Sequence, residues 1–596
     1  MSFWRAENKI PIVQTSHTLT AQNGLEFGAG QQIVIEIPPT SIKFFQPKET
    51  YLNFDFKLKA PSDAVGPTRL QLDSELGGQA LIKTIRLLSH GGVLLEEIQN
   101  YNVMKSVINS YNTDDTLKSK RALTENSTTF SILNKGTNGG EKSMCADTMT
   151  NPYFKPIEMT GSDAQTIFTD DDFLSVKMCL QLHTGIFSSD KVYPNLLTGL
   201  RLEIELEDAD KVVQQLDSVN RWNKLTLNPV FDSVEGDVAD SNWISGNASS
   251  SNTFYCKIAN SCHKPEHQGF VVGEKISFVN VNNGSFVSFK RTSDGAAYVP
   301  AIAKINASAA APGGGGKGLL QITLDDAVDV DGTAPGDDIT RGGYYMVSQS
   351  LKDAGQPSYV VSNVEMVVQE LDMGAGYEAD MLKRMKEGGV MNLDILSCTN
   401  YRYSQLQSDL VATMRLPIDN SRCRSIWCVP TSSKLHLPEE NITGKDCYDV
   451  SGHSTTAGTL PQGNGDGTTY NTRASLVGVS DNLQKYNFFY SGRLQPSRKV
   501  SVAKTSSKYS IDAMPCIEQE KALVQADVPA RSFASFNKNF FIGRSFSLNQ
   551  GVEDLRNQDF TLQLEYGTQT TPKLWNNFLW HLRSIVIRGD DVSVQV

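Results

Sequence analysis

The sequence predicts an all-β chain that contains two similar β-domains in tandem. Three observations lead to this prediction. Apolar and polar residues alternate in short runs along the whole chain, convincing helical patterns are few, and one succession of β-patterns occurs twice. With 596 residues, the chain is several times longer than a typical domain, which excludes a single small domain.

Alternation of apolar and polar residues marks strands that have one buried face. The clearest segments are QQIVIEI (31–37), YLNFDFKL (51–58), LSVKMCLQL (174–182) and LRLEIELE (200–207). The last segment has an apolar face and a charged face. The apolar residues are Leu200, Leu202, Ile204 and Leu206, and the charged residues are Arg201, Glu203, Glu205 and Glu207. This segment therefore predicts a strand of an antiparallel sheet with one side in solvent.

Turns and helices separate these strands. His90-Gly91-Gly92 lies between IRLLS and VLLEEI, and glycine suits the tight turn of a hairpin. Two helices are expected, each with an apolar stripe. The stripe residues are Tyr101, Met104, Ile108 and Tyr111 in the first helix, and Tyr377, Met381 and Met385 in the second, which ends at Gly388-Gly389. Many strands with few helices favour a sandwich or barrel architecture.

The internal duplication divides the chain near residue 390. Three successive β-patterns at 173–183, 197–207 and 359–371 are matched in order by patterns at 539–548, 557–567 and 581–596. We therefore predict an N-terminal arm, a first β-domain, a helical connector and a second β-domain. Their ranges are 1–25, 26–375, 376–390 and 391–596.

Each predicted domain is interrupted by a segment rich in loop-forming residues. Residues 215–356 are rich in Gly, Ser, Asn and Ala, and short strand patterns occur at 271–280, 297–305 and 318–328. This segment predicts a small β-barrel inserted before the last strand of the first domain. A second loop-rich insertion is expected at 437–482. Long loops on a rigid scaffold commonly carry contacts to partners.

Composition limits the classes of function. Lys and Arg number 55 and Asp and Glu number 66, so the net charge is 55 − 66 = −11, which argues against binding of nucleic acid through phosphate neutralisation. Nine scattered cysteines fit reduced thiols. The N-terminal MSFWRAENKIPIVQ lacks the apolar core of a signal peptide, so we expect synthesis in the cytoplasm.

Several motifs suggest chemistry, and each has a simpler interpretation. The GGGGKG run at 313–318 lacks the first Gly and the Ser or Thr of a phosphate-binding loop, because Ala311 and Gly318 occupy those positions, so a hairpin loop is favoured. Cys256, Cys262, His263 and His267 are zinc-ligand types, but their spacing matches no common zinc finger.

An acidic segment at 325–338 suggests a cation site, although its alignment with a calcium loop starts at Ala327 and ends at Asp338 instead of Glu, which favours a solvated turn. Its acidic residues are Asp325, Asp326, Asp329, Asp331, Asp337 and Asp338. Cys423 and Cys428 lie in a strand-like run and are expected to be buried. No nucleophile or metalloprotease motif occurs, so we expect no enzyme activity, no cofactor and no catalytic or metal-binding residues.

Four segments resemble the double jelly-roll major capsid proteins of polinton-like viruses, virophages and related eukaryotic dsDNA viruses. The segments are 77–112, 197–207, 359–372 and 486–500. They resemble, in order, the strand–hairpin–helix unit of the first jelly roll, its penultimate strand, its closing strand, and a strand–Pro–strand unit of the second. The resemblance covers most of the chain and implies two eight-stranded jelly rolls with a tower insertion at 215–356.

The resemblance also implies a function in the virion. It implies homotrimers with a pseudo-hexagonal outline that tile an icosahedral shell around a dsDNA genome. The implied partners are other copies of the chain, neighbouring trimers, a penton protein and minor or cement proteins. The arm at 1–25, with Trp4, Arg5 and Lys9, would become ordered on assembly. The alternative is a receptor- or glycan-binding jelly-roll protein of a virus or phage, which the scarcity of Trp (six residues) disfavours.

Overall fold

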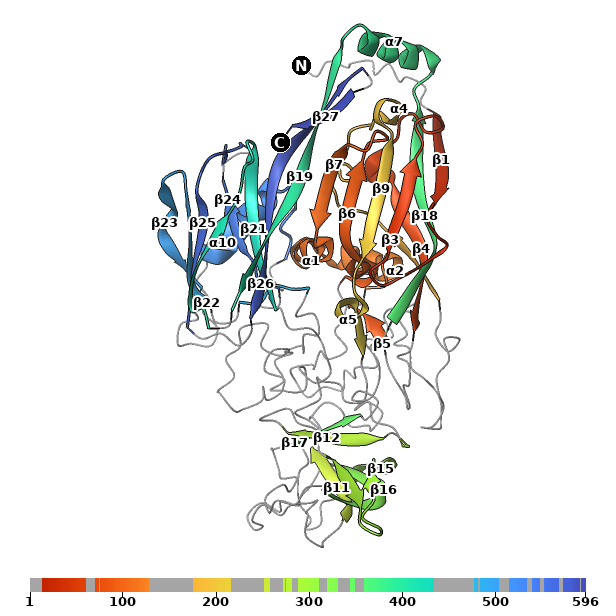
Figure 1. The fold of residues 1–596 in the computed structure, drawn as a ribbon, viewed down its shortest axis with the longest axis vertical. Helices are drawn as coiled ribbons and strands as arrows, with labels where there is room; N and C mark the ends of the chain where they lie inside the picture. Colours follow the sequence, from red (N-terminus) through yellow and green to blue (C-terminus); the bar gives the residue numbers. More distant parts are fainter. Residues whose placement is uncertain are drawn as a thin grey trace.

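Two β-sandwiches lie side by side in the computed structural model, and a smaller β-region lies beyond one end of them (Figure 1). The residues that the structure describes are 13–59, 70–73, 76–127, 175–215, 251–257, 272–273, 275–280, 288–309, 319–330, 344–348, 358–406, 408–432, 476–480, 483–502, 514–532, 539–546, 551–567, 572–589 and 591–595. Within this part of the chain, no helix is long and apolar enough to cross a membrane.

The first sandwich consists of two antiparallel sheets. One sheet has the order β1-β18-β4-β8, with β2 beside β18, and the other has the order β3-β9-β6-β7. The strands of the first sheet are β1 (Val13–Thr20), β2 (Glu26–Gly28), β4 (Tyr51–Lys59), β8 (Val176–Leu180) and β18 (Ser358–Asp372). Those of the second are β3 (Gln32–Ile37), β6 (Ile82–Leu88), β7 (Leu94–Gln99) and β9 (Leu200–Leu206).

The second sandwich repeats this arrangement. Its sheets have the orders β19-β26-β21-β24, with β27 beside β26, and β20-β25-β22-β23. The strands of the first sheet are β19 (Val390–Gln405), β21 (Cys423–Ser432), β24 (Ile542–Ser545), β26 (Lys573–Arg588) and β27 (Asp591–Gln595). Those of the second are β20 (Val411–Leu416), β22 (Leu483–Tyr490), β23 (Arg493–Ser501) and β25 (Phe560–Tyr566).

Both sandwiches have jelly-roll topology. When the eight main strands of each sandwich are numbered in chain order, strands 1, 8, 3 and 6 form one sheet and strands 2, 7, 4 and 5 form the other. The two sandwiches also share a register shift in the pairing of strand 4 with strand 7. It lies between Ile82 and Thr84 in β6 and between Leu483 and Lys485 in β22. The predicted all-β fold with two tandem jelly rolls is thus confirmed.

The alternating sequence pattern produces the buried faces. In β9 and in its counterpart β25, every second side chain is buried in the interior of the sandwich. Arg201, Glu203 and Glu205 lie on the solvent side, as predicted. Glu207 does not, because it follows the end of β9 and is buried, where it accepts a 2.9 Å hydrogen bond from Asn102 Nδ2.

Helices occupy matching places in the two sandwiches. After strand 5 the chain enters α1 (Tyr101–Tyr111) in the first sandwich and reaches α10 (Met514–Gln525) in the second. The helix at 101–111 was predicted, and its four stripe residues are buried. The helix α10 was not predicted from the sequence. The remaining helices and short strands are η1 (Pro47–Glu49), η2 (Gly77–Leu81), α2 (Asp115–Thr124), α4 (Asn195–Thr198), α5 (Ala209–Val212), β5 (Leu70–Leu72) and β10 (Val213–Gln215).

The helix α7 (Ala375–Lys386) joins β18 to β19 at the end of the molecule opposite the smaller β-region (Figure 1). Met381 and Met385 of its predicted stripe are buried, whereas Tyr377 is 46% exposed and rests edge-on against Phe44 at 5.7 Å between ring centres. The two β-rich halves are therefore connected through a single helix that lies on the first sandwich.

The smaller β-region lies between strands 7 and 8 of the first sandwich in the chain. Its described strands form a five-stranded and a two-stranded sheet, so the expected small barrel is two open sheets in the part that is described. The strands are β11 (Ser251–Lys257), β12 (Ile276–Asn280), β13 (Phe289–Arg291), β14 (Ala297–Tyr298), β15 (Ile302–Ala309), β16 (Leu319–Val330) and β17 (Tyr344–Ser348). They include strands in all three predicted segments.

Two predicted loop or arm segments differ from the structure. Residues 13–20 of the expected N-terminal arm form β1, which pairs with β18 over eight residues. The arm prediction is therefore wrong for these residues, because a polar edge strand such as VQTSHTLT carries no apolar alternation in its sequence. In the expected insertion at 437–482, residues 437–475, 481 and 482 lie outside the described residues, whereas Leu476, Val477 and Val479 are buried.

Replacement of Leu202 by Ala tests the core of the first sandwich. Leu202 is fully buried in β9, so the loss of its side chain should lower the free energy of unfolding by about 3 kcal/mol. Val411→Ala is the control, because Val411 is 75% exposed in β20 and its truncation should change the stability by no more than about 0.5 kcal/mol. Equal effects of the two substitutions in urea denaturation would contradict the assigned strand faces.

Candidate functional site

The structure separates the residues of the sequence motifs. The glycine run at 313–318 lies outside the described residues, as do Cys262, His263 and His267, so of that candidate zinc cluster only the backbone of Cys256 is placed, in β11. Cys423 and Cys428 are fully buried in β21, as predicted, and burial raises the pKa of both thiols. Among the described residues, no group of three His, Cys, Asp or Glu side chains could hold a metal ion.

The acidic segment at 325–338 is in part a strand. Residues 325–330 belong to β16, which corrects the expected turn, and residues 331–338 lie outside the described residues. The Asp325 carboxylate accepts hydrogen bonds from Tyr298 Oη (2.6 Å) and Ala301 N (3.0 Å). Asp326 pairs with Arg291 at 2.8 Å. These two carboxylates therefore brace the inserted sheet.

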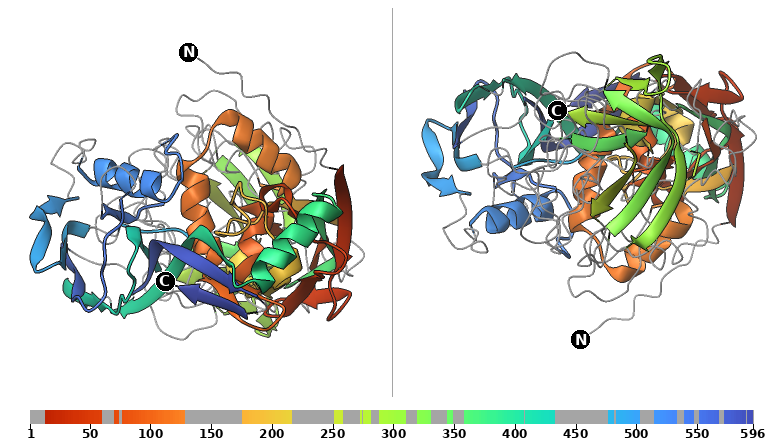
Figure 2. Two further views of the ribbon diagram at one scale, coloured as in Figure 1. Left: turned by 90° about the horizontal axis from the view of Figure 1, so that it is seen from above. Right: turned by 90° about the horizontal axis from the view of Figure 1, so that it is seen from below.

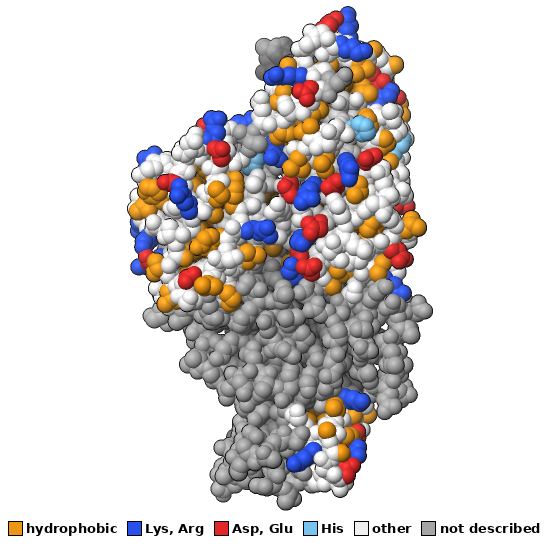
Figure 3. Space-filling model, in the orientation of Figure 1, with side chains coloured by type: hydrophobic (Ala, Val, Ile, Leu, Met, Phe, Trp, Pro, Cys, Tyr) orange, Lys and Arg blue, Asp and Glu red, His pale blue; other side chains and the backbone are white. Residues whose placement is uncertain are grey.

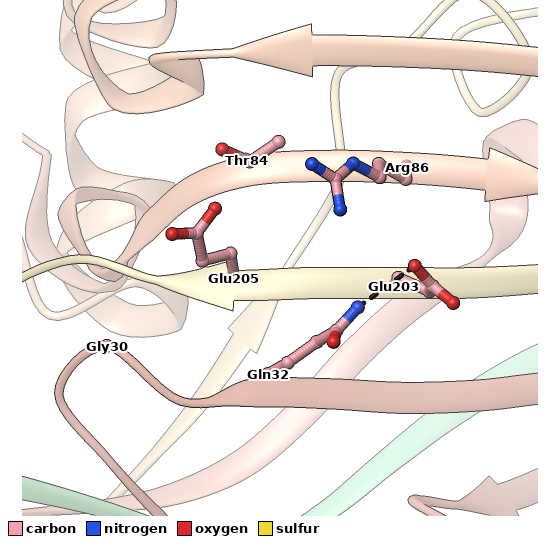
Figure 4. A pocket seen from close by; sticks show the side chains of 6 residues that line it. All are labelled: Gly30, Gln32, Thr84, Arg86, Glu203 and Glu205. Carbon is pink, nitrogen blue, oxygen red and sulfur yellow. Dashed lines mark hydrogen bonds between the residues drawn. The ribbon is translucent and has the colours of Figure 1, made fainter.

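A shallow pocket of about 230 Å³ lies on the solvent face of the sheet that contains β3, β9 and β6 (Figure 4). Its lining residues are Gly30, Gln32, Thr84, Arg86, Glu203 and Glu205. Gln32 Nε2 donates to Glu203 at 2.9 Å, Lys83 pairs with Glu205 at 2.8 Å, and Arg86 pairs with Glu97 at 3.0 Å. Because these polar side chains form hydrogen bonds and ion pairs with one another, the pocket resembles an ordinary solvent-exposed face of a sheet.

The junction between the two sandwiches is the most elaborate site in the described structure. The helix α1 lies between the sandwiches (Figures 1 and 2), and all its residues except Lys105 are buried. A helix that is buried on every side must pack against two bodies. One apolar cluster runs across the junction, since Tyr101 and Met104 of α1 share it with Trp427 and Trp580 of the second sandwich.

Glu96 of β7 holds three segments together. Its carboxylate is 1% exposed and accepts hydrogen bonds from Gly185 N (2.8 Å), Ile186 N (3.3 Å) and Ser397 Oγ of β19 (2.8 Å). Burial raises the pKa of Glu96, although these hydrogen bonds and the charge of Arg583 partly oppose that shift. One side chain thus links the fifth strand of the first sandwich to the first strand of the second.

Close backbone contact accompanies this hydrogen bonding. A Cβ atom on Gly185 would lie 2.7 Å from Leu396 O of β19, so only glycine allows the two sandwiches to approach at this point. Nearby, Arg583 of β26 donates from Nη1 to Leu95 O at 2.8 Å. The backbones of both sandwiches therefore contribute to the junction.

Asparagine side chains form a second group of contacts. Asn400 of β19 donates from Nδ2 to Gln99 O (3.2 Å) and to Asn576 Oδ1 (3.1 Å). Asn576 Oδ1 also accepts from Asn100 Nδ2, on the residue that precedes α1. Asn100 has φ = 52°, a left-handed conformation that asparagine adopts more readily than most residues.

A third group connects the C-terminal half of α1 and the residues after it to Arg531 and Asn539. Asn539 donates from Nδ2 to Ser106 Oγ (2.8 Å) and Ser110 Oγ (2.9 Å), and its Oδ1 accepts from Gly478 N (2.9 Å). Tyr111 Oη donates to Asn539 O at 2.9 Å, and Arg531 forms an ion pair with Asp114. Small hydroxyl groups on α1 thus meet a single amide that belongs to the second sandwich.

The chemistry of this site is structural. His183 lies within 3.4 Å of Ser188 Oγ and against the Trp580 ring, and burial lowers the pKa of His183 to about 3, which keeps its ring neutral. His581 is likewise held neutral, with its pKa lowered to about 3. Neutral rings and a large number of buried hydrogen bonds suit a fixed joint between two bodies.

Sequence reasoning did not identify this junction. It predicted α1 from the apolar stripe, but it assigned no contacts to the polar residues between the stripe positions, such as Ser106, Asn109 and Ser110. They are buried against the second sandwich. The sequence did contain a signal for this burial, because all polar residues of the helix except one lysine have small side chains.

Comparison with known proteins finds similar solved structures but no similar sequences. No protein-family model matches the sequence, and no curated protein matches it. The chain is similar in structure to the major capsid protein of Faustovirus (10% identity, TM-score 0.46, 97% of this chain and 90% of that chain) and to the mavirus major capsid protein (10% identity, TM-score 0.34, 98% and 90%). It is also similar to the PBCV-1 capsid protein VP54 fitted into a reconstruction of the virophage Sputnik (8% identity, TM-score 0.47, 98% and 97%). The assignment of the fold rests on the strand order described above.

Asn539→Ala tests the third group of contacts. The substitution removes the acceptor of the buried Gly478 N–H and the amide that donates to two serine hydroxyls, so the free energy of unfolding should fall by about 2 kcal/mol and amide hydrogen exchange in α1 should accelerate. Asn392→Ala, at an exposed position in β19, is the control and should leave both quantities unchanged. Unaltered exchange in α1 of the Asn539 variant would show that this contact does not hold the junction.

Glu96→Gln tests the buried carboxyl group through pH. Because burial raises the pKa of Glu96 above its ordinary value of 4.5, its folded form binds a proton more tightly than its unfolded form. The stability that this group contributes is therefore complete below pH 4.5 and is lost as the pH rises through the raised pKa. The unfolding free energy of the wild type should decline relative to that of the variant across this range.

Urea denaturation at a series of pH values measures this difference. Glu97→Gln is the matched control, because Glu97 is the next residue of β7 and pairs with the partly exposed Arg86. A constant offset between the Glu96 variant and the wild type at every pH would contradict the raised pKa.

Proposed function

We propose that the chain is the major capsid protein of an icosahedral dsDNA virus and that it assembles as a homotrimer. The observation that carries this proposal is the pair of jelly rolls with the same strand order, held in one chain by a buried junction. Three such chains supply six similar sandwiches, which suffices to build a pseudo-hexagonal unit with threefold symmetry. A unit with a hexagonal outline can tile a closed shell.

The sequence resemblance supports the same proposal. The segment 77–112 contains strands 4 and 5 and α1 of the first sandwich, 197–207 contains strand 7, and 359–372 contains strand 8. The segment 486–500 contains strands 4 and 5 of the second sandwich. Each segment therefore lies where the resemblance to double jelly-roll capsid proteins requires it.

The distribution of the loops suits a shell protein. The inserted β-region lies at one end of the sandwiches, and α7 lies at the other (Figure 1). In our proposal the inserted region is a tower on the outer surface, and the end with α7 faces the interior of the virion. Charged side chains of both signs are interspersed over the described face of the sandwiches (Figure 3), so the contacts of this face would be distributed over many polar groups.

We also propose where the chain divides into domains and which partners it binds. The two domains meet near residue 390, and the first domain begins with β1 instead of after a free arm. The partners are other copies of the chain, neighbouring trimers, a penton protein and minor or cement proteins. The shell would enclose the dsDNA genome, but we propose no sequence-specific binding of nucleic acid, because the net charge of −11 does not favour it as a direct ligand.

The mass of the purified chain in solution tests this function. Light scattering should give 3 × 65.5 = 196.5 kDa, and negative-stain images of the same peak should show hexagonal outlines. We expect the trimer to be stable because its six sandwiches share a large lateral surface. A particle of 65.5 kDa at every protein concentration and ionic strength would contradict the proposal and would favour the receptor- or glycan-binding alternative.

A further inference from the structure

Two histidines lie at the junction between the sandwiches, one from each side. His183 follows β8 of the first sandwich, and its ring lies edge-on against the Trp580 ring of β26, with 6.1 Å between the ring centres. His581 is the next residue of β26 and is fully buried. Trp580 thus connects the two histidines, because it contacts the first and precedes the second.

His581 lies among the residues that hold the first sandwich. It is opposite Ser397 in the pairing of β26 with β19, and Ser397 Oγ donates to the Glu96 carboxylate at 2.8 Å. Two residues further along β26, Arg583 donates from Nη1 to Leu95 O at 2.8 Å. A displacement of His581 would therefore move residues of both strands that contact the first sandwich.

The surroundings of His581 favour an uncharged ring. Its Nε2 lies 2.9 Å from Thr399 Oγ1, and its Nδ1 has no hydrogen-bond partner among the described residues. The guanidinium groups of Arg583 and Arg422 add to the effect of burial, and only the backbone of Leu582 partly opposes them. A protonated imidazole donates through both nitrogens, so protonation here would bury a charge between two cations.

The other titratable groups around His581 do not supply a countercharge. On β21 the opposite residue is Cys423, and burial raises the pKa of its thiol to about 12, so that the thiol stays protonated. On β19, Asp394 pairs with Arg422 at 3.3 Å. Across the junction, burial raises the pKa of Glu96, which favours its uncharged form.

His183 has a similar environment on the first sandwich. Its ring is partly buried, its Nδ1 lies 3.4 Å from Ser188 Oγ, and its backbone N–H donates to Tyr101 Oη of α1 at 3.0 Å. The charged group that acts on the ring is the Lys105 ammonium of α1, which disfavours a second cation. The carboxyl group of Glu125 acts on Lys105, but burial raises the pKa of Glu125 as well.

We propose that His183 and His581 make the junction an acid-sensitive joint, which is closed near neutral pH and opens when the two rings take up protons. In the open state water would reach both rings and hydrate their charge. The joint lies within one chain, so this inference does not depend on the trimer. In an assembled shell, acidification would loosen each chain internally.

The direction of the pH effect follows from the pKa values. In the closed junction, burial and the neighbouring cations lower the pKa of His581 and of His183 to about 3. A solvated imidazole has a pKa of about 6.5, so the stability that each histidine contributes is complete above that pH and is lost as the pH falls toward 3. From about pH 7.5 to about pH 5, each ring should shift the equilibrium about thirtyfold toward the open state.

Amide hydrogen exchange of the full chain tests this inference. Exchange rates in α1 and β26 are expressed as protection factors, relative to an unstructured peptide at the same pH. The ratio of the wild-type protection factor to that of His581→Gln should fall about thirtyfold from about pH 7.5 to about pH 5, because the glutamine amide does not titrate. The ratio cancels the opposite contribution of Glu96. His183→Gln should give a fall of the same direction.

Two further variants complete the design. His581→Phe keeps a planar ring without a titratable nitrogen and should reproduce the pH dependence of the glutamine variant. His90→Gln is the matched control, because His90 is exposed in the turn between β6 and β7, and its ratio to the wild type should be the same at every pH.

The outcomes decide the inference separately from the proposed function. Ratios that do not change with pH in the His581 and His183 variants would contradict it. Acid-induced exchange that is equal in all strands of both sandwiches would also contradict it, because the whole fold and not the joint would then open. Light scattering of the same samples records the trimer, so the capsid function stands or fails on its own result.

Discussion

The buried polar junction between the two sandwiches is the constraint on which the rest of the structure depends. Glu96 and Asn539 each form several buried hydrogen bonds, and a buried polar group that loses its partner costs on the order of 1–3 kcal/mol. A shift of one sandwich against the other would break all these contacts together. The shared apolar cluster around α1 supplies attraction, while the hydrogen bonds select a single arrangement.

This fixed arrangement makes the chain suitable as a building unit. Two loosely tethered sandwiches could meet at many angles, whereas a closed ring needs one angle repeated at each contact. Glycine at position 185 and the small hydroxyl residues of α1 allow the close approach that sets this angle. The jelly-roll order brings strand 1 and strand 5 to the edges of the sheets in both sandwiches, and the junction within the chain joins two such edges, β7 and β19.

The sequence predicted the parts of the fold that depend on local periodicity. Alternation located β3, β4, β8 and β9, and the repeated patterns identified strands 6 to 8 of both sandwiches. It did not predict β1, because an edge strand with both faces exposed lacks an apolar face, nor α10, whose buried residues include polar ones such as Glu518 and Gln519. Glu207 was assigned to solvent because its position continues the pattern of β9, but the strand ends one residue earlier. The junction escaped prediction because it depends on long-range contacts, with Asn539 more than 400 residues from Ser106.

The most direct test of this account is a three-dimensional reconstruction of the assembled chain by electron cryo-microscopy. We expect a particle with threefold symmetry in which six sandwiches form a ring and β7 lies against β19 inside each chain. The inserted β-regions should project from one end of this ring. A particle in which the two sandwiches of a chain lie apart would contradict the claim that the buried junction makes each chain a single fixed unit.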